Sequence, residues 1–254
     1  MILTIDVGNS NIVVGAFDGD TLAFSARLNT EKKRLSDEYA IDLRNIFALY
    51  GAGSTVEGAI LSSVVPGLTP VLKRAIKLVF DLDVLIVGPG IKTGMNIRID
   101  NPSQLGSDIL ADAVGAFAQY PAPIVIFDLG TASTISVTDE NGSILGGAIL
   151  PGVTLSLNAL SQTAAQLPEI SMEAPRDIIG TNTIDSMRSG ILFGNASMID
   201  GMIDRLTERL GKVPTVVATG GIAETIVPLC KHSIILDPAL QLKGLLRLYR
   251  KNRP

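Results

Sequence analysis

The sequence of 254 residues contains one cysteine, one histidine and no long apolar run. The single Cys230 excludes an intrachain disulfide framework and is typical of a reducing compartment, so we expect a cytoplasmic protein. The single His232 argues against a histidine-based catalytic triad or zinc site, and we interpret it as a residue at the edge of a strand. No apolar run is long enough to cross a bilayer, so we expect no membrane partner.

Charge is also scarce, because charged residues make up only 18% of the chain and the net charge is −4. The sequence has no basic stripe, so we expect no nucleic-acid partner. Its first residues carry no basic group ahead of an apolar run, so we predict no signal peptide. The hydrophobic content of 46% indicates a globular chain with enough residues for one large or two modest cores.

Among what is present, residues 2–17 form an apolar stretch with a polar turn in its middle. The apolar residues on either side predict two strands. Glycine lets the turn be tight, and amide, hydroxyl and backbone N–H groups in a concave turn suit phosphate oxygens. The aspartate at the strand end is suited to hold a hydrated divalent metal. Taken alone, however, this stretch favours an ordinary hairpin with a polar turn, because Asp-x-Gly is common. The turn residues are Asp6, Gly8, Asn9, Ser10 and Asn11.

The same pattern returns in residues 124–142, where Asp128 and Gly130 lie 122 residues after Asp6 and Gly8. An internal repeat of this kind predicts two similar domains, one in each half of the chain. The remaining pattern agrees, because each half places three strands before alternating helices and strands. This order predicts an α/β protein with mixed sheets, and no long linker separates the halves.

Two Asp-x-Gly hairpins followed by a Thr-Gly-Gly turn resemble the superfamily of actin, hexokinase and the heat-shock ATPases. The resemblance implies an α/β fold of two ribonuclease-H-like (actin-like ATPase) domains with mixed sheets, residues 1–120 and 121–254, and a cleft between them. In that superfamily the two hairpins grip phosphates and the Gly-Gly turn lies against adenosine. Ligands also favour such strand ends in α/β folds generally.

Within that superfamily the chain resembles type III pantothenate kinase from residue 2 to about residue 236. Six short motifs in the family's order carry the likeness: Asp6–Ile12, Asp100–Pro102 with Leu105–Asp108, Asp128–Ala132, Gly147–Gly152, Gly180–Thr183 and Ala218–Gly221. The resemblance implies phosphorylation of pantothenate by ATP to 4′-phosphopantothenate, the first step of coenzyme A biosynthesis. It also implies Mg²⁺, a monovalent cation (K⁺ or NH₄⁺) and a homodimer.

The resemblance also implies roles for single residues. Asp108 is then the general base for the substrate hydroxyl, Asp128 binds the monovalent cation and Asp6 the magnesium. From the residues alone, the preferred interpretation of Asp108 is a helix-start carboxylate stabilised by the helix dipole. The other implied site residues form two groups. ATP is bound by Asp6, Val7, Gly8, Asn9, Ser10, Asn11, Ile12, Val13, Thr131, Gly220 and Gly221, and pantothenate by Gly106, Ser107, Asp108, Ile109 and Thr183.

Two positions depart from the family pattern. Ile109 stands where the family usually has Arg, and Ile99 where it usually has Tyr, and both of those residues normally help to bind pantothenate. Arginine can pair bidentately with a carboxylate, whereas isoleucine cannot. Arg98 and Lys92 are candidate substitutes. The alternatives to a pantothenate kinase are a non-catalytic or regulatory nucleotide-binding relative and a kinase of a different small alcohol.

Overall fold

The computed structural model of the chain describes residues 1–52 and 55–253. These residues form two compact units. Unit 1 comprises Met1–Gly94, Asn101–Ala118 and Leu240–Pro254, and unit 2 comprises Met95–Asp100 and Gln119–Ala239. The units differ from the predicted halves 1–120 and 121–254 chiefly because the last helix belongs to unit 1.

The sheet of unit 1 has the strand order β3-β2-β1-β4-β5. The first three strands are antiparallel neighbours joined by short turns, and the last two add in parallel beside β1. β1 is central, which explains why all its residues after Ile2 are buried. The strands are β1 (Ile2–Val7), β2 (Asn11–Asp18), β3 (Thr21–Asn29), β4 (Gly58–Ser63) and β5 (Val84–Ile86).

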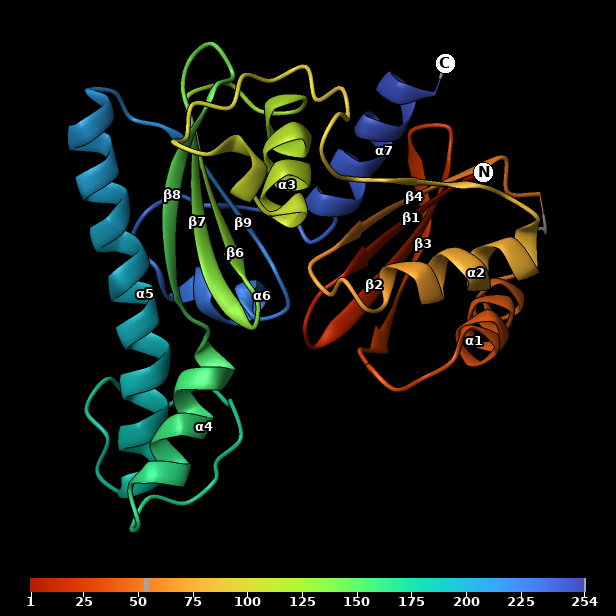
Figure 1. The fold of residues 1–254 in the computed structure, drawn as a ribbon. Helices are drawn as coiled ribbons and strands as arrows, with labels where there is room; N and C mark the ends of the chain where they lie inside the picture. Colours follow the sequence, from red (N-terminus) through yellow and green to blue (C-terminus); the bar gives the residue numbers. More distant parts are fainter. Residues whose placement is uncertain (53–54, 254) are drawn as a thin grey trace. The chain divides into compact units, whose positions relative to one another are not determined.

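Helices cover both faces of this sheet (Figure 1). The odd-numbered residues of β1 pack against α1 (Ser36–Leu49) and α2 (Thr69–Phe80). The other face carries α7 (Leu240–Asn252), against which α3 (Ser107–Phe117) lies after a short 3-10 turn, Pro102–Gln104. The helices α3 and α7 approach closely at Gly244, where a Cβ would lie 1.8 Å from the Ala111 carbonyl oxygen.

The sheet of unit 2 has the order β10-β9-β6-β7-β8, which repeats unit 1 strand by strand. The central pair and its outer neighbour are antiparallel, and the two strands on the other side are parallel to β6. This repetition confirms the predicted α/β fold with two mixed sheets. The strands are β6 (Ile124–Leu129), β7 (Ala132–Thr138), β8 (Ile144–Pro151), β9 (Thr215–Thr219) and β10 (Ile235–Leu236).

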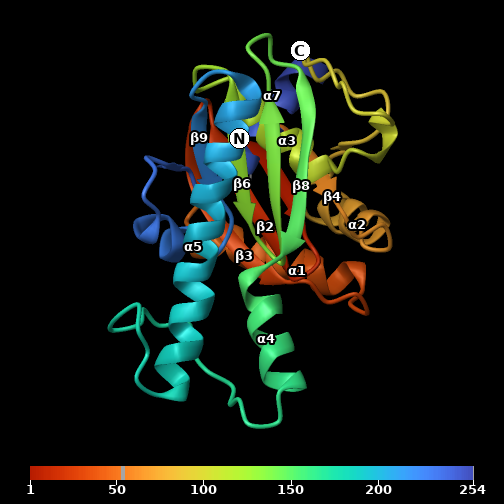
Figure 2. The ribbon, with the colours of Figure 1, turned by 90° about the vertical axis from the view of Figure 1, so that its left-hand side faces the viewer.

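The long helix α5 (Thr183–Leu210) packs across the sheet of unit 2, where Leu192, Ile199 and Ile203 join a core with Val125 and Phe127. The short helices α6 (Ala223–Ile226) and η2 (Val227–Leu229) lie against α5. Figures 1 and 2 show α4 (Val153–Thr163) and the first turns of α5 extending beyond the ends of the strands. This extension belongs to unit 2 alone.

Thr183 and Ser36 have hydroxyl side chains typical of helix caps, yet each lies one residue inside its helix. Thr183 is the first residue of α5, and the side chain of Asn182 caps the helix by accepting the Asp185 N–H at 2.9 Å. Leu35, rather than Ser36, stands before α1, where Glu38 accepts the Leu35 N–H at 2.7 Å. In the described part of the chain, no helix is both long and apolar enough to cross a membrane.

Candidate functional site

The first predicted phosphate turn joins β1 to β2. Strand pairing sets Asp6 opposite Val13, and the Gly8 N–H donates to the Asn11 carbonyl at 2.9 Å, which closes the turn. The tip residues Asn9 and Ser10 are exposed, as is Asn11, whereas Asp6 is only 7% exposed. The sequence therefore produces a fixed carboxylate at the strand end and a polar turn open to solvent above it.

Asp6 lies on the face of the sheet that carries α3. Parallel pairing of β1 with β4 places Ser62 next to Asp6, and paired residues project from the same face. The buried Ser62 hydroxyl donates to the Ser107 hydroxyl at 3.0 Å, and Ser107 is the first residue of α3. The predicted metal ligand Asp6 and the predicted base Asp108 therefore belong to the same unit. Asp6 pairs with Ser62, and Ser62 bonds the serine that precedes Asp108.

The start of α3 is shaped around the carboxylate of Asp108. This half-buried carboxylate accepts the Ile109 N–H at 2.8 Å through Oδ1. A Cβ at Gly106 would lie 2.2 Å from the same oxygen, far inside van der Waals contact. Glycine at position 106 therefore leaves the space that the carboxylate occupies. The structure therefore gives a physical reason for both the glycine and the aspartate of the motif Gly106–Asp108.

The second predicted turn lies in unit 2 and repeats the position of the first. Asp128 near the end of β6 pairs with Thr134 on one side and Thr219 on the other. Gly220 follows Thr219 with a φ of +94°, and a Cβ there would lie 2.6 Å from Asp128 Oδ1. The structure therefore brings the predicted cation ligand against the Thr-Gly-Gly turn, and the exposed Gly221 comes next.

Thr131 lies in the same turn, beside the end of β8. The Gly152 N–H donates to the Thr131 carbonyl at 3.2 Å, and a Cβ at Gly152 would lie 2.3 Å from that oxygen. Close backbone packing therefore holds this turn. Among the described residues, no three His, Cys, Asp or Glu side chains are grouped so as to share a metal ion. Asp6 and Asp128 lie at two equivalent strand ends and belong to no such group among the described residues.

The predicted pantothenate residue Thr183 lies elsewhere in unit 2, exposed at the start of α5. It lines an open groove of about 690 Å³ between α4 and α5. The groove has an apolar side formed by Leu160, Leu167, Met187 and Ile191, and a polar side formed by Gly180–Thr183 and Ser186. The motif Gly180–Thr183 therefore forms one wall of a hollow large enough for a small molecule.

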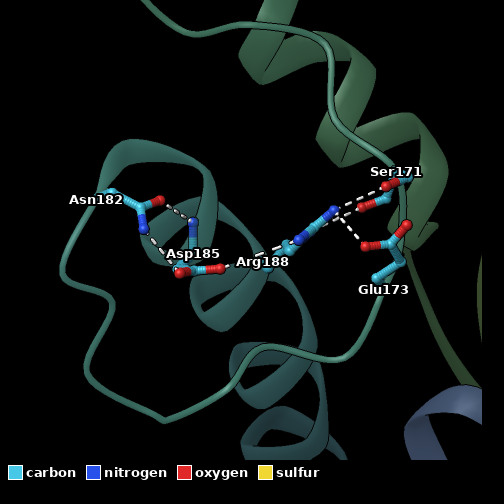
Figure 3. A network of polar contacts seen from close by, with 5 residues as sticks. All are labelled: Ser171, Glu173, Asn182, Asp185 and Arg188. Atoms are coloured by element: carbon cyan, nitrogen blue, oxygen red, sulfur yellow. Dashed lines mark hydrogen bonds and ion pairs between the residues drawn. The ribbon is translucent and has the colours of Figure 1, made fainter.

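A polar network holds that wall in place (Figure 3). The Arg188 guanidinium donates to Ser171 Oγ and to Glu173 Oε2, both at 2.8 Å, and Asn182 donates to Asp185 Oδ2 at 2.8 Å. Because Arg188 and Asp185 belong to α5, these bonds tie the irregular segment before the helix to the helix itself. The position of Thr183 is therefore set by side chains on both sides of it.

The segment that holds Ile99 runs beside β8 of unit 2. Ile97 bridges Ile144, the Arg98 N–H donates to the Ile144 carbonyl at 2.8 Å, and Ile99 Cγ2 lies 3.8 Å from where a Cβ at Gly146 would stand. The Arg98 guanidinium lies 3.5 Å from a carboxylate oxygen of Asp139. Arg98, considered above as a substitute for the missing guanidinium, therefore has a carboxylate partner within its own unit.

The ion pair with Arg98 also bears on the carboxyl of Asp139. Burial by itself would raise the pKa of Asp139, but N–H bonds from Ser143 and Asn141 and the positive charge of Arg98 hold that pKa below its usual value. The carboxylate is therefore charged at neutral pH and continues to attract Arg98. A substrate carboxylate would have to compete with it for the guanidinium.

Sequence reasoning missed two residues beside the first turn. The Ser62 hydroxyl donates to the Ser107 hydroxyl, and the Thr30 hydroxyl donates to the Gly8 carbonyl at 2.8 Å. Strand register was the signal available for both. The hairpin of β2 and β3 aligns Asn11 with Asn29, which places Thr30 next to Ser10.

Comparison with known proteins agrees with this geometry. A model of the type III pantothenate kinase family matches residues 2–205. A type III pantothenate kinase of Pelobacter propionicus is 44% identical over 254 residues, which cover 100% of both chains. The chain belongs to the type III pantothenate kinase family. Members of this kinase family use ATP together with a divalent metal.

Two solved structures show the fold alone. One is the activator of the 2-hydroxyisocaproyl-CoA dehydratase from Clostridium difficile, with a TM-score of 0.56, 14% identity and coverage of 98% of this chain and 94% of that one. The other is the ROK hexokinase from Thermus thermophilus, with a TM-score of 0.50, 16% identity and coverage of 97% of each chain. The type III pantothenate kinase family thus shares the fold of actin-like ATPases and sugar kinases.

Proposed function

We propose that this chain transfers the γ-phosphoryl group of ATP to the primary hydroxyl of pantothenate and releases 4′-phosphopantothenate and ADP. Family membership over most of the chain is the observation that carries this proposal. The geometry of unit 1 supports it, because Asp6 and Asp108 lie near the same serine pair, Ser62 and Ser107.

In this proposal Asp108 accepts the proton of the substrate hydroxyl as the oxygen attacks phosphorus. Phosphoryl transfer depends mainly on positioning and on neutralising charge, so one well-placed carboxylate is a sufficient base. The turn residues Asp6 to Val13, together with Thr131, Gly220 and Gly221, bind ATP. Ser107, Ile109 and Thr183 contact pantothenate, and Gly106 keeps the space that the base requires.

Two cations complete the proposed site. Mg²⁺ in kinase sites is held by one or two carboxylates and by substrate phosphates, and Asp6 at the end of β1 fits that requirement. Asp128 is the proposed ligand of a monovalent cation (K⁺ or NH₄⁺), because its carboxylate lies near the end of β6 against Gly220, where the negative triphosphate would need a counter-ion. When bound, the cations offset the negative charge of the triphosphate.

We further infer a homodimer. Unit 2 exposes several large apolar side chains on β8, on α4, in the irregular segment and at the start of α5. A single exposed apolar side chain needs no explanation, whereas several in one unit favour an interface. These side chains are Ile149 at 75%, Leu155 at 51%, Ile178 at 64%, Ile179 at 76% and Ile184 at 43% exposed. Light scattering at micromolar concentration is expected to give twice the chain mass, and a monomer mass would contradict the dimer.

The deciding experiment is a coupled assay of ADP release by the purified chain. Turnover is expected with MgATP and pantothenate together in potassium buffer, with little release when pantothenate is omitted. Mass spectrometry of the product identifies the phosphorylated acceptor. Tris as the sole monovalent cation is expected to lower the rate. An equal rate in Tris would remove the monovalent cation from the proposal.

Two other results would replace the proposed reaction. If ATP binds but no ADP is released with pantothenate or with other small alcohols, the chain is a nucleotide-binding relative without this activity. If another small alcohol stimulates release and pantothenate does not, the acceptor differs while the phosphoryl donor stays the same. The ADP-release assay distinguishes the two outcomes, and calorimetry measures ATP binding independently.

A further inference from the structure

Thr30, the residue that follows β3, donates two hydrogen bonds to the backbone of the phosphate turn of unit 1. The Thr30 hydroxyl donates to the Gly8 carbonyl at 2.8 Å, and the Thr30 N–H donates to the Ser10 carbonyl at 3.0 Å. A trans peptide points its C=O and N–H in opposite directions. Because both carbonyls point at Thr30, the N–H groups that follow them, those of Asn9 and Asn11, point away from it.

Glu31, the residue after Thr30, is held by a buried tyrosine. Tyr39 of α1 is fully buried, and its hydroxyl both accepts the Glu31 N–H and donates to the Glu31 carbonyl, each at 3.1 Å. The Arg34 guanidinium lies 4.7 Å from the centre of the Tyr39 ring and 2.7 Å from Asp42. The short segment between β3 and α1 is therefore fastened to the helix at several points, and Thr30 is its first residue.

We propose that Thr30 and Tyr39 are positioning residues for the ATP phosphates. They fix the peptide planes of the turn so that the Asn9 and Asn11 N–H groups are already directed outward before the nucleotide arrives. This inference rests on the proposed function, in which the turn Asp6–Asn11 binds ATP. Thr30 acts through the turn's backbone, and Tyr39 acts through Glu31 and the adjoining Thr30, so neither residue itself contacts the nucleotide.

Preorganisation explains why two such bonds matter for a phosphate site. Donors that are already aligned need no rearrangement when charge arrives, whereas a turn free to rotate its peptides spends binding free energy on ordering itself. One neutral hydrogen bond contributes modestly, so removing the Thr30 hydroxyl is expected to weaken MgATP binding by about three- to tenfold. Loss of the Tyr39 hydroxyl acts one step further away and is expected to produce a smaller effect in the same direction.

The test measures the dissociation constant of MgATP and the Michaelis constants of both substrates for four variants. Thr30→Val keeps the side-chain shape and removes the hydroxyl, Thr30→Ser restores it, and Tyr39→Phe removes the second hydroxyl. Thr21→Val, at the exposed opposite end of β3, is the matched control. Thr30→Val is expected to weaken MgATP while the KM for pantothenate stays within about twofold of wild type, and Thr30→Ser is expected to restore MgATP affinity.

Three outcomes would overturn the inference and leave the proposed function intact. Thr30→Val could bind MgATP as tightly as Thr21→Val, or it could weaken both substrates equally with no recovery in Thr30→Ser, which would indicate only a general loss of structure. If Thr30→Val does not fold, unchanged MgATP affinity in Tyr39→Phe overturns it. A wild-type chain that does not bind MgATP would instead overturn the proposed function, and with it this inference.

Discussion

The two turns that carry the proposed ATP site occupy the same position in two sheets of the same strand order, yet they are stabilised in different ways. In unit 1, hydroxyl groups hold the turn and its neighbour helix: Thr30 bonds Gly8, and Ser62 bonds Ser107. In unit 2, backbone packing does so, because Gly152 and Gly220 lie where any side chain would collide with the turn.

This difference distinguishes what the repeated fold positions from what individual side chains contribute. The repeated strand order puts a carboxylate at each equivalent strand end, Asp6 and Asp128, whatever surrounds it. Hydroxyl bonds can be removed one atom at a time, whereas a glycine packed on backbone cannot be changed without displacing the chain. Substitutions in unit 1 should therefore alter substrate affinity and rate, while substitutions at the glycines of unit 2 should alter stability as well.

The largest expected effect is on turnover, in unit 1. Asp108→Asn is expected to lower kcat by about 10²–10⁴-fold, the usual contribution of a general base, because the amide cannot take the proton of the attacking hydroxyl. Nucleotide affinity and the unfolding midpoint should stay near wild type, since Asn keeps the shape of the group that Gly106 accommodates.

The control for this substitution is Asp112→Asn, one helical turn further along α3 and buried. It is expected to affect stability more than the chemical step. Steady-state kinetics with calorimetry of MgATP separates the two effects. Turnover of Asp108→Asn near the wild-type level, with intact nucleotide binding, would contradict the role assigned to Asp108.

The next effect concerns which unit recognises the pantothenate carboxylate. Ile109 belongs to unit 1 and Ile99 to unit 2, so Ile109→Arg and Ile99→Tyr test the units separately. A charge-assisted hydrogen bond is worth about 1.5–3 kcal/mol, so the double variant is expected to lower the KM for pantothenate by about ten- to a hundredfold. Burying a carboxylate without a paired donor is otherwise unfavourable.

The two single variants sharpen the comparison. If only Ile109→Arg lowers the KM, unit 1 provides the carboxylate contact, and if only Ile99→Tyr does so, the segment beside β8 provides it. A double variant with unchanged KM and intact catalysis would show that another group already binds the carboxylate. Arg98→Ala then tests whether the guanidinium paired with Asp139 is that group.

Much of this arrangement follows from local pattern. The apolar runs around Asp6 and Asp128 predict two hairpins, and their separation predicts the repeat that the two sheets confirm. The local sequence pattern does not predict the packing between elements that are far apart in the sequence. Nothing near Gly244 indicates that α7 crosses α3 and so belongs to unit 1. Likewise, the residues around position 104 do not by themselves indicate that Asn101 caps a 3-10 turn and that α3 begins only at Ser107.

The site shows the same limit. The sequence could predict Asp6, Asp108 and Asp128 from motif residues, but it could not show that Thr30 bonds the turn or that Arg98 is already paired with Asp139. Those contacts depend on which strands become neighbours and in which register. The register of β2 and β3 follows from their hairpin only if the exact first and last residues of each strand are known. The sequence pattern alone locates these strand ends only approximately.

A smaller effect, on stability, compares one glycine from each turn. Gly220→Ala places a side chain at a φ of +94° and 2.6 Å from backbone atoms of Leu129, so it is expected to lower the free energy of unfolding by about 2 kcal/mol. Gly8→Ala meets only the Asn11 carbonyl at 3.1 Å and should cost about 1 kcal/mol or less. Urea unfolding measures both, and equal losses would contradict the contrast between the turns.

The smallest expected effect isolates the hydroxyl pair at the start of α3. Ser62→Ala removes the donor to Ser107, and an average hydrogen bond of this kind contributes about 1 kcal/mol. The free energy of unfolding should fall by about that amount. Because Ser107 precedes Asp108 in the helix, kcat should fall by a few-fold while MgATP affinity stays unchanged.

The matched control lies at the equivalent position of unit 2, where Thr219 of β9 is buried beside Asp128 as Ser62 is beside Asp6. Thr219→Ser keeps the hydroxyl and loses a methyl group, so it is expected to change stability by a similar amount and to leave kcat unaffected. A fall in kcat that is the same for both substitutions would mean that turnover follows stability in general. A fall confined to Ser62→Ala would place the positioning of the base in unit 1, where α3 begins.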